Sequence, residues 1–210
     1  MKIFLDFDDV LFNTKAFRND LMGIFRKNGV SRKDFLASYK DYPTVSRGGL
    51  KKYDPFKQIE LLEKKFGIDG KKIAEDLGEF LASCPKYIFR DVKAFLKQFS
   101  KRKLYLISYG HTGFQDKKID NSGISPFFQK IVVTDKMKAI AIRRFAKKDE
   151  TLIFLEDRTE QINEIKKYFS RSITFLVKRK EGRYADKRTK YVDYEVRDLR
   201  EASKVLRQLN

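Results

Sequence analysis

Short apolar segments that alternate with helix-length stretches dominate the sequence from residue 85 onward. Strands are expected at residues 104–107, 131–133, 152–155, 173–177 and 192–196, with helices near 112–120, 136–147 and 160–169. A further apolar segment at residues 3–5 begins the chain. Strands that are apolar along their whole length are buried on both faces, which is typical of a parallel sheet with helices on either side. The pattern therefore predicts an α/β fold with a parallel sheet at its core.

Residues 15–89 follow a different pattern, which predicts a helical insert after the first strand. Apolar side chains recur there at helical spacing. Gly29 and Gly67 each follow such a run, as expected at a helix C-terminus, and Asp54-Pro55 is a typical helix start. The expected organisation is an α/β core domain of residues 1–14 and 90–210, with a helical cap domain at residues 15–89.

The chain is strongly basic but still able to fold. Its 210 residues include 47 Lys and Arg against 29 Asp and Glu, a formal net charge of +18, and 41% of the residues are hydrophobic. That apolar content is enough for a buried core. The charge attracts anionic substrates and favours weak, nonspecific nucleic-acid binding at low salt. Basic residues are densest at 178–190, a stretch that is either a solvated loop or a phosphate- or RNA-binding patch.

The apolar segments are too short to cross a membrane. None approaches the roughly 18 uninterrupted apolar residues of a membrane span, and Asp6 makes the N-terminus acidic too early for a signal peptide. We therefore expect a soluble, cytoplasmic protein with no membrane partner. The sequence does not determine the oligomeric state.

Cysteine and histidine are nearly absent, which excludes several kinds of site. Cys84 and His111 are the single residues of their types, so an intramolecular disulfide and a structural zinc site are excluded. A hydrolase triad would depend on His111, yet no nucleophile motif such as Gly-x-Ser-x-Gly accompanies it. We expect Cys84 to be a small buried residue and His111 to lie on a surface loop.

Polar residues follow three of the predicted strands at the point where each strand ends. They are Asp6, Asp8 and Asp9 after the first strand, Ser108 after the second, and Glu156 and Asp157 after strand 152–155. Ligands of open α/β sheets bind at this edge of the sheet. Several carboxylates placed together repel one another unless a cation neutralises them, and Mg²⁺ prefers such oxygen ligands. The sequence therefore predicts a Mg²⁺ site at the carboxyl ends of the strands.

These segments resemble the ordered motifs of the haloacid dehalogenase-like (HAD) phosphohydrolase superfamily. Residues 3–11 resemble its first motif, an apolar strand followed by Asp-x-Asp, and residues 105–108 its second, a strand that ends in Ser or Thr. Residues 152–157 resemble the fourth motif, a strand that ends in an acidic pair. The resemblance implies a Rossmann-like sheet, and the helical insert is similar to the C1-type cap of that superfamily.

The resemblance also implies roles for the acidic residues. Asp6 would be the nucleophile that forms an aspartyl-phosphate, and Asp8 would protonate the leaving oxygen and later deprotonate water. The Asp6 side chain and the Asp8 main-chain carbonyl would bind Mg²⁺, together with Asp157, aided by Glu156. Asp9 would be structural.

The phosphoryl oxygens would be held by Ser108 and by the lysine of the third motif. Lys136 is the better match to that motif by its place before strand 152–155, and Lys138 is the alternative. These groups would offset the charge of the transition state.

The expected function is a Mg²⁺-dependent phosphatase that hydrolyses a phosphate monoester of a small metabolite. Two alternatives stay open: a phosphomutase, and a basic nucleic-acid-binding or polynucleotide-end-processing protein on the same fold. The sequence does not name the substrate. Arg47, beside Gly48-Gly49 in the helical insert, is either part of an exposed loop or a substrate-specificity residue on a loop that closes over the site.

Overall fold

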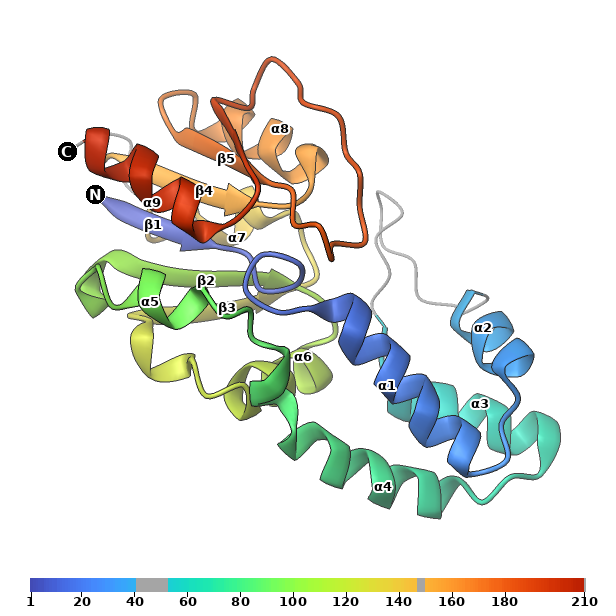
Figure 1. Ribbon diagram of the computed structural model, residues 1–210. Coiled ribbons are helices and arrows are strands. Elements are labelled where there is room, and N and C mark those ends of the chain that lie inside the picture. Colours follow the sequence, from blue (N-terminus) through green and yellow to red (C-terminus); the bar gives the residue numbers. More distant parts are fainter. Residues whose placement is uncertain (41–52, 147–149, 210) are drawn as a thin grey trace.

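The computed structural model describes residues 1–40, 53–146 and 150–209, and its centre is a six-stranded parallel sheet (Figure 1). The sheet has the order β3-β2-β1-β4-β5-β6. The strands are β1 (Lys2–Leu5), β2 (Leu104–Tyr109), β3 (Lys130–Thr134), β4 (Leu152–Glu156), β5 (Ile173–Val177) and β6 (Tyr194–Val196). Every neighbouring pair is parallel. The predicted α/β fold with a parallel, Rossmann-like sheet is confirmed.

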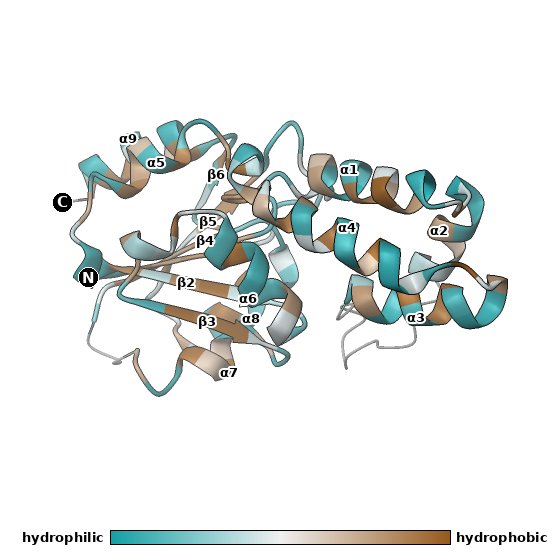
Figure 2. Cartoon of the chain, turned by 90° about the horizontal axis from the view of Figure 1, so that it is seen from below, coloured by the Kyte–Doolittle hydropathy of each residue, from teal (hydrophilic) through white to brown (hydrophobic). Residues whose placement is uncertain are grey.

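Alternating residues of the strands face two separate apolar layers, as the period of two in a strand requires. Ile3 and Leu5 pack in one layer with residues of α5 (Val92–Leu96), α6 (Thr112–Asn121) and α9 (Leu199–Gln208). Phe4 faces the other layer, which includes residues of α7 (Lys138–Ile142) and α8 (Thr159–Tyr168). Figure 2 shows α5 and α9 on one side of the sheet and α7 on the opposite side. Burial on both faces explains why the strand segments are continuously apolar.

Among the described residues of the insert, four helices follow the first strand and extend away from the sheet (Figure 1). They are α1 (Thr14–Lys27), α2 (Arg32–Lys40), α3 (Pro55–Phe66) and α4 (Gly70–Ala82). The side chain of Asp54 caps α3 by accepting from the backbone N–H of Phe56, and Gly67 ends that helix in the left-handed region, with φ 65°. The predicted start and end of this helix are confirmed. The exact division of the chain into core and cap domains stays a prediction.

Two elements are shorter than the sequence pattern predicts. The helix expected at residues 136–147 begins at Lys138, because Lys136 lies in a turn where its backbone N–H donates to Thr134 Oγ1 (3.1 Å). The last strand begins at Tyr194, because Val192 packs in a small separate cluster with Ile162 and Leu176. Among the residues described, no helix is long and apolar enough to cross a membrane.

Candidate active site

A cavity of about 460 Å³ lies where the carboxyl ends of β1, β2 and β4 meet the helices of the insert. The sheet supplies Asp6 and Asp8 from the end of β1, Tyr109 from β2, and Glu156 and Asp157 from β4. The insert supplies the opposite side of the cavity, with side chains from α1 and α2. This is the crevice at the edge of an open α/β sheet where the strand order changes direction, and ligands bind there in such folds.

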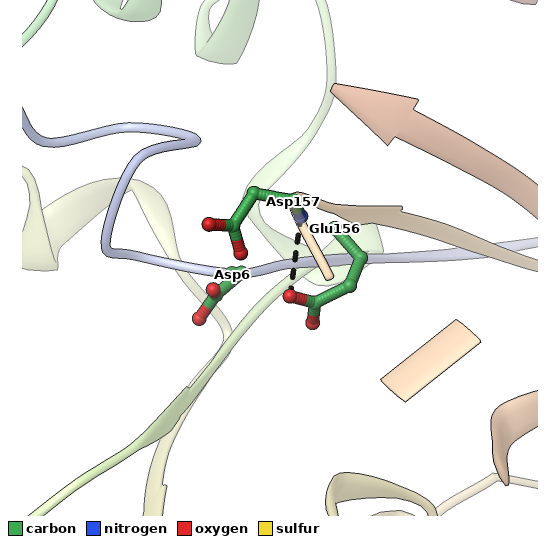
Figure 3. Close-up of side chains that lie close together, drawn as sticks. All are labelled: Asp6, Glu156 and Asp157. Carbon is green, nitrogen blue, oxygen red and sulfur yellow. Dashed lines mark hydrogen bonds between the residues drawn. The ribbon is translucent and has the colours of Figure 1, made fainter. Parts of the chain in front are cut away.

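Three carboxylates that line the cavity lie close together, as Figure 3 shows. Oxygen atoms of Asp6, Glu156 and Asp157 all lie within 4.8 Å of one another, and the three residues are buried. The backbone N–H of Asp157 donates to Glu156 Oε1 (3.2 Å), which fixes the orientation of the Glu156 side chain. Oxygen donors of this kind and number suit Mg²⁺, which binds through a few carboxylates and keeps its other positions for water and phosphate oxygens.

Lys138 is the cation of this cluster. Its Nζ lies 2.7 Å from Asp6 Oδ1 and 2.6 Å from Glu156 Oε2, and the side chain is only 2% exposed. Lys136, the preferred candidate from the sequence, is instead exposed in the turn before α7. Of the two lysines that the sequence left open, the structure therefore brings Lys138 to the carboxylates and leaves Lys136 outside.

The electrostatics of the cluster show that its negative charge is not fully balanced. Burial, and then the neighbouring Glu156, raise the pKa of Asp6 to about 8, although Lys138 acts to lower it. Burial, Glu156 and Asp6 also raise the pKa of Asp157 well above its usual range. With a pKa of about 8, the Asp6 carboxyl holds a proton at neutral pH unless another cation is present. The residues therefore fit a bound divalent cation.

Asp8 lies in a different environment, although it is only two residues from Asp6. Its carboxylate accepts hydrogen bonds from Thr14 Oγ1 (2.6 Å), Lys118 Nζ (2.7 Å) and Gln115 Nε2 (2.8 Å). Burial works to raise the pKa of Asp8, but the Lys118 ammonium and the Arg183 guanidinium outweigh burial and hold that pKa below its usual range. Asp8 is therefore ionised and held in one orientation.

Ser108 is connected to Asp8 through one side chain. Gln115 Nε2 donates to Ser108 Oγ (2.7 Å) as well as to Asp8. Ser108 is fully buried and is not among the residues that line the cavity. The structure thus places the predicted phosphate-binding serine directly behind Gln115, one side chain away from the cavity.

Lys118 is a site residue that the sequence analysis did not identify. Its side chain is 3% exposed, and its Nζ lies 4.9–5.6 Å from the ring centroids of Phe7, Phe12, Phe17 and Phe114. A sequence signal does exist, because Lys118 follows Phe114 at the i+4 position and precedes Ile119, so it lies on the apolar stripe of α6. A lysine on such a stripe is expected to be buried with an acidic partner.

The basic stretch at residues 178–190 is attached to the loop that follows β1. Arg179 donates from Nε and Nη2 to the Val10 carbonyl (3.1 and 2.8 Å) and from Nη1 to Asp91 (2.9 Å). Arg183 Nε donates to Asp9 Oδ2 (2.5 Å), and Asp9 has a left-handed backbone with φ 58°. At least part of this stretch is therefore a structural support for the loop that carries Asp6 and Asp8.

His111 and Cys84, two other residues singled out in the sequence, are not among the residues that line the cavity. His111 precedes α6 and its Nδ1 is 3.6 Å from Asp54 Oδ2. Cys84 is free and buried, as expected. Arg47 lies outside the residues that the structure describes, so its predicted role stays a prediction.

Comparison with known proteins identifies the fold. No family model and no curated protein matches the chain, but many solved structures do. A protein assigned to the haloacid dehalogenase-like hydrolases of Burkholderia xenovorans LB400 is 18% identical, with 95% of each chain covered and a TM-score of 0.72. The L-2-haloacid dehalogenase PA0810 is 14% identical, with 98% of each chain covered and a TM-score of 0.67.

A third solved structure also matches the chain. YfnB of Bacillus subtilis, assigned to the HAD hydrolases and solved with magnesium bound, is 15% identical, with 98% of this chain and 97% of that chain covered and a TM-score of 0.64. Identities this low establish the fold alone, and the cap type stays a prediction. The six-stranded parallel sheet, the acidic strand ends and these matches together show that this chain has the haloacid dehalogenase-like fold.

Proposed function

We propose that this protein is a Mg²⁺-dependent phosphatase that hydrolyses phosphate monoesters through an aspartyl-phosphate on Asp6. The observation that carries the proposal is the arrangement of two acidic residues on one loop. Asp6 lies among carboxylates and Lys138 in a site suited to a cation, while Asp8, two residues on, lies in a separate hydrogen-bonded environment and lines the same cavity. Two carboxylates with different environments suit a nucleophile and an acid/base.

The proposed first step transfers the phosphoryl group to the enzyme. An Asp6 carboxylate oxygen attacks phosphorus, an oxygen–phosphorus bond forms, and the bond from phosphorus to the leaving oxygen breaks. The Asp8 carboxylate, which is ionised in the free protein, takes up a proton from solvent as the substrate binds and gives this proton to the leaving oxygen. A substrate dianion beside Asp8 raises the pKa of that carboxyl and so opposes the effect of Lys118.

In the second step, water attacks the aspartyl-phosphate, Asp8 accepts the proton of the water, and Asp6 is released together with inorganic phosphate. Lys138, whose Nζ lies 2.7 Å from Asp6 Oδ1, would offset the negative charge of the phosphoryl oxygens. Mg²⁺, which Asp6, Asp157 and Glu156 would hold, supplies further positive charge to these oxygens when bound.

Dehalogenases are among the proteins of this fold, as the match to PA0810 shows. A dehalogenase would use Asp6 to displace halide and would not need an acid for the leaving group. Asp8 is hydrogen-bonded and lines the cavity, and the carboxylate cluster is suited to a bound cation. Both features favour phosphate esters over organic halides as substrates.

The proposal is tested by a panel of phosphate monoesters with Mg²⁺ and with EDTA. We expect release of inorganic phosphate only with Mg²⁺. Asp6→Asn should leave below about 1% of the activity, because loss of a nucleophile costs several orders of magnitude. Asp120→Asn, an exposed carboxylate on α6, is the matched control and should retain activity. Turnover by Asp6→Asn at the wild-type rate would refute the nucleophile, and transfer of the phosphoryl group to a second substrate hydroxyl would indicate a phosphomutase.

A further inference from the structure

The part of the cavity away from the carboxylates is lined by aromatic rings. Tyr39 of α2, Tyr53, Phe114 of α6 and Tyr184 of the β5–β6 loop all line it, and so come from four separate segments. The ring centroids of Tyr39 and Tyr53 are 4.7 Å apart, and those of Tyr53 and Phe114 are 5.9 Å apart in an edge-on arrangement. We call Tyr39, Tyr53, Phe114 and Tyr184 the aromatic wall. Phosphate chemistry at Asp6 does not require any of these rings.

Guanidinium groups accompany the aromatic wall. The guanidinium carbon of Arg158 lies 4.0 Å from the ring centroid of Tyr184, and that of Arg183 lies 5.0 Å from it. Arg18 of α1 lies 5.5 Å from the ring centroid of Tyr39. Flat rings with arginines beside them are the elements that stack on and hydrogen-bond to heteroaromatic ligands.

Arg18 differs from the other cations that line the cavity. Lys118, Lys138, Arg158 and Arg183 each form an ion pair with a carboxylate. Over the described ranges 1–40, 53–146 and 150–209, the Arg18 guanidinium lies against the Tyr39 ring and has no carboxylate partner. Its N–H donors are therefore available to acceptor atoms of a ligand that lies against the aromatic wall.

We propose that the aromatic wall binds a nucleobase, so that the substrate carries a nucleoside monophosphate unit. The inference rests on the proposed phosphatase function and names its substrate class. The base would stack on the tyrosines, while Arg18 would donate to carbonyl or ring-nitrogen acceptors on the edge of the base. A cavity of about 460 Å³ is within the ordinary range for ligands of this size. A short sugar phosphate or phosphoglycolate has no flat ring to stack on the aromatic wall.

The nucleoside monophosphate unit can belong to a free nucleotide or to the phosphorylated end of an oligonucleotide. Both are anions that the net charge of +18 attracts. Only the oligonucleotide continues beyond the first nucleotide, so a mononucleotide and a short oligonucleotide with a 5′-phosphate distinguish the two sources.

The decisive substrates are adenosine 5′-monophosphate, cytidine 5′-monophosphate and ribose 5-phosphate, because ribose 5-phosphate has the same sugar and phosphate but no base. With Mg²⁺, we expect kcat/KM for the nucleotides to exceed that for ribose 5-phosphate by roughly 10-fold or more, the lower part of the range for stacking of one base on an aromatic side chain. The same comparison with the 5′-phosphorylated oligonucleotide identifies the source.

Two variants test the wall itself. Tyr39→Ala and Arg18→Met should each reduce the preference for nucleotide over ribose 5-phosphate by roughly fivefold or more. The matched controls are Tyr168→Ala, a partly exposed tyrosine on α8, and Arg26→Met, an exposed arginine on the same helix as Arg18. Both controls should keep the wild-type preference. Far-ultraviolet circular dichroism confirms that each variant is folded.

Binding to the Asp6→Asn protein separates failure of this proposal from failure of the phosphatase proposal. If phosphate esters are hydrolysed but ribose 5-phosphate equals the nucleotides, the phosphatase stands and the base site is refuted. If no ester is hydrolysed while calorimetry shows tighter binding of adenosine 5′-monophosphate than of ribose 5-phosphate, the base site stands and the phosphatase is refuted. Retention of the full preference by both Tyr39→Ala and Arg18→Met would also overturn the base site.

Discussion

Replacement of Lys118 by Met should destabilise the folded protein more than most single substitutions. Methionine keeps an unbranched apolar side chain among the four phenylalanine rings but removes the ammonium that lies 2.7 Å from Asp8 and 3.1 Å from Gln115 Oε1. The Asp8 carboxylate then stays largely buried with only Thr14, Gln115 and the more distant Arg183 to balance it.

The size of the effect depends on the burial of the pair. Removal of one partner from a buried ion pair costs about 3–5 kcal/mol. Asp8 keeps two other hydrogen bonds, and its side chain is 17% exposed, so we expect a loss near the lower limit, about 3 kcal/mol. For a chain of this size that loss lowers Tm by roughly 6–12 °C.

The assay is urea unfolding of the wild type, Lys118→Met, Asp8→Asn and the double variant at neutral pH. In the double variant no unpaired charge stays buried, so we expect it to be more stable than Lys118→Met by about 1–2 kcal/mol, and the four proteins together give the coupling energy between Lys118 and Asp8. The low pKa of Asp8 in the folded protein gives stability that is present above the unfolded pKa and lost as pH falls through the folded pKa. The difference between wild type and Lys118→Met should therefore shrink below about pH 4. A loss below about 1 kcal/mol, or strictly additive variants, would refute this reasoning.

Two further predictions concern the carboxylate cluster. Lys138→Met should lower kcat/KM about 100-fold or more, as expected when a charge-stabilising donor is removed. Lys136→Met should change kcat/KM by no more than about twofold, because substitutions of exposed surface residues have small effects. A larger loss in Lys136→Met than in Lys138→Met would contradict the choice of Lys138 as the lysine of the site. Because the pKa of Asp6 is raised from 3.8 to about 8 in the folded protein, ionisation destabilises the metal-free protein progressively as pH rises over that range. Thermal unfolding should therefore show a larger Mg²⁺-induced rise in Tm at pH 8 than at pH 5, with a rise at pH 8 of about 5–10 °C at saturating Mg²⁺. This rise should disappear in Asp157→Asn. Equal rises in Tm at both pH values would count against the metal site.

Local patterns were sufficient to predict the sheet and the acidic edge. A strand that is apolar along its length is visible in the sequence, and the residue after it necessarily lies at the carboxyl end. The positions of Asp6, Asp8, Glu156 and Asp157 follow from that rule. The local pattern does not decide between Lys136 and Lys138, because that choice depends on where α7 begins. The turn between Thr134 and Lys136 delays the helix and brings Lys138, rather than Lys136, to the carboxylates.

The remaining site residues act over long separations in the chain. Lys118 contacts Asp8 across 110 residues, and Arg183 contacts Asp9 across 174 residues. No local spacing connects such pairs, and in a chain with 47 basic residues a single lysine or arginine carries little signal. Only the folded arrangement shows that these two cations contact the loop that carries Asp6, Asp8 and Asp9.

The central claim, that Asp6 forms a phosphoryl-enzyme, is tested most directly by chemical trapping. The protein is mixed with a hydrolysed phosphate ester and Mg²⁺, quenched during turnover and treated with borohydride, which reduces an acyl phosphate to an alcohol. Mass spectrometry of the N-terminal peptide should then find homoserine in place of aspartate at position 6 in the wild type, and no such product in Asp6→Asn or in EDTA. Rapid turnover with Asp6 unmodified under every quench condition, or reduction at Asp8 instead, would contradict the account.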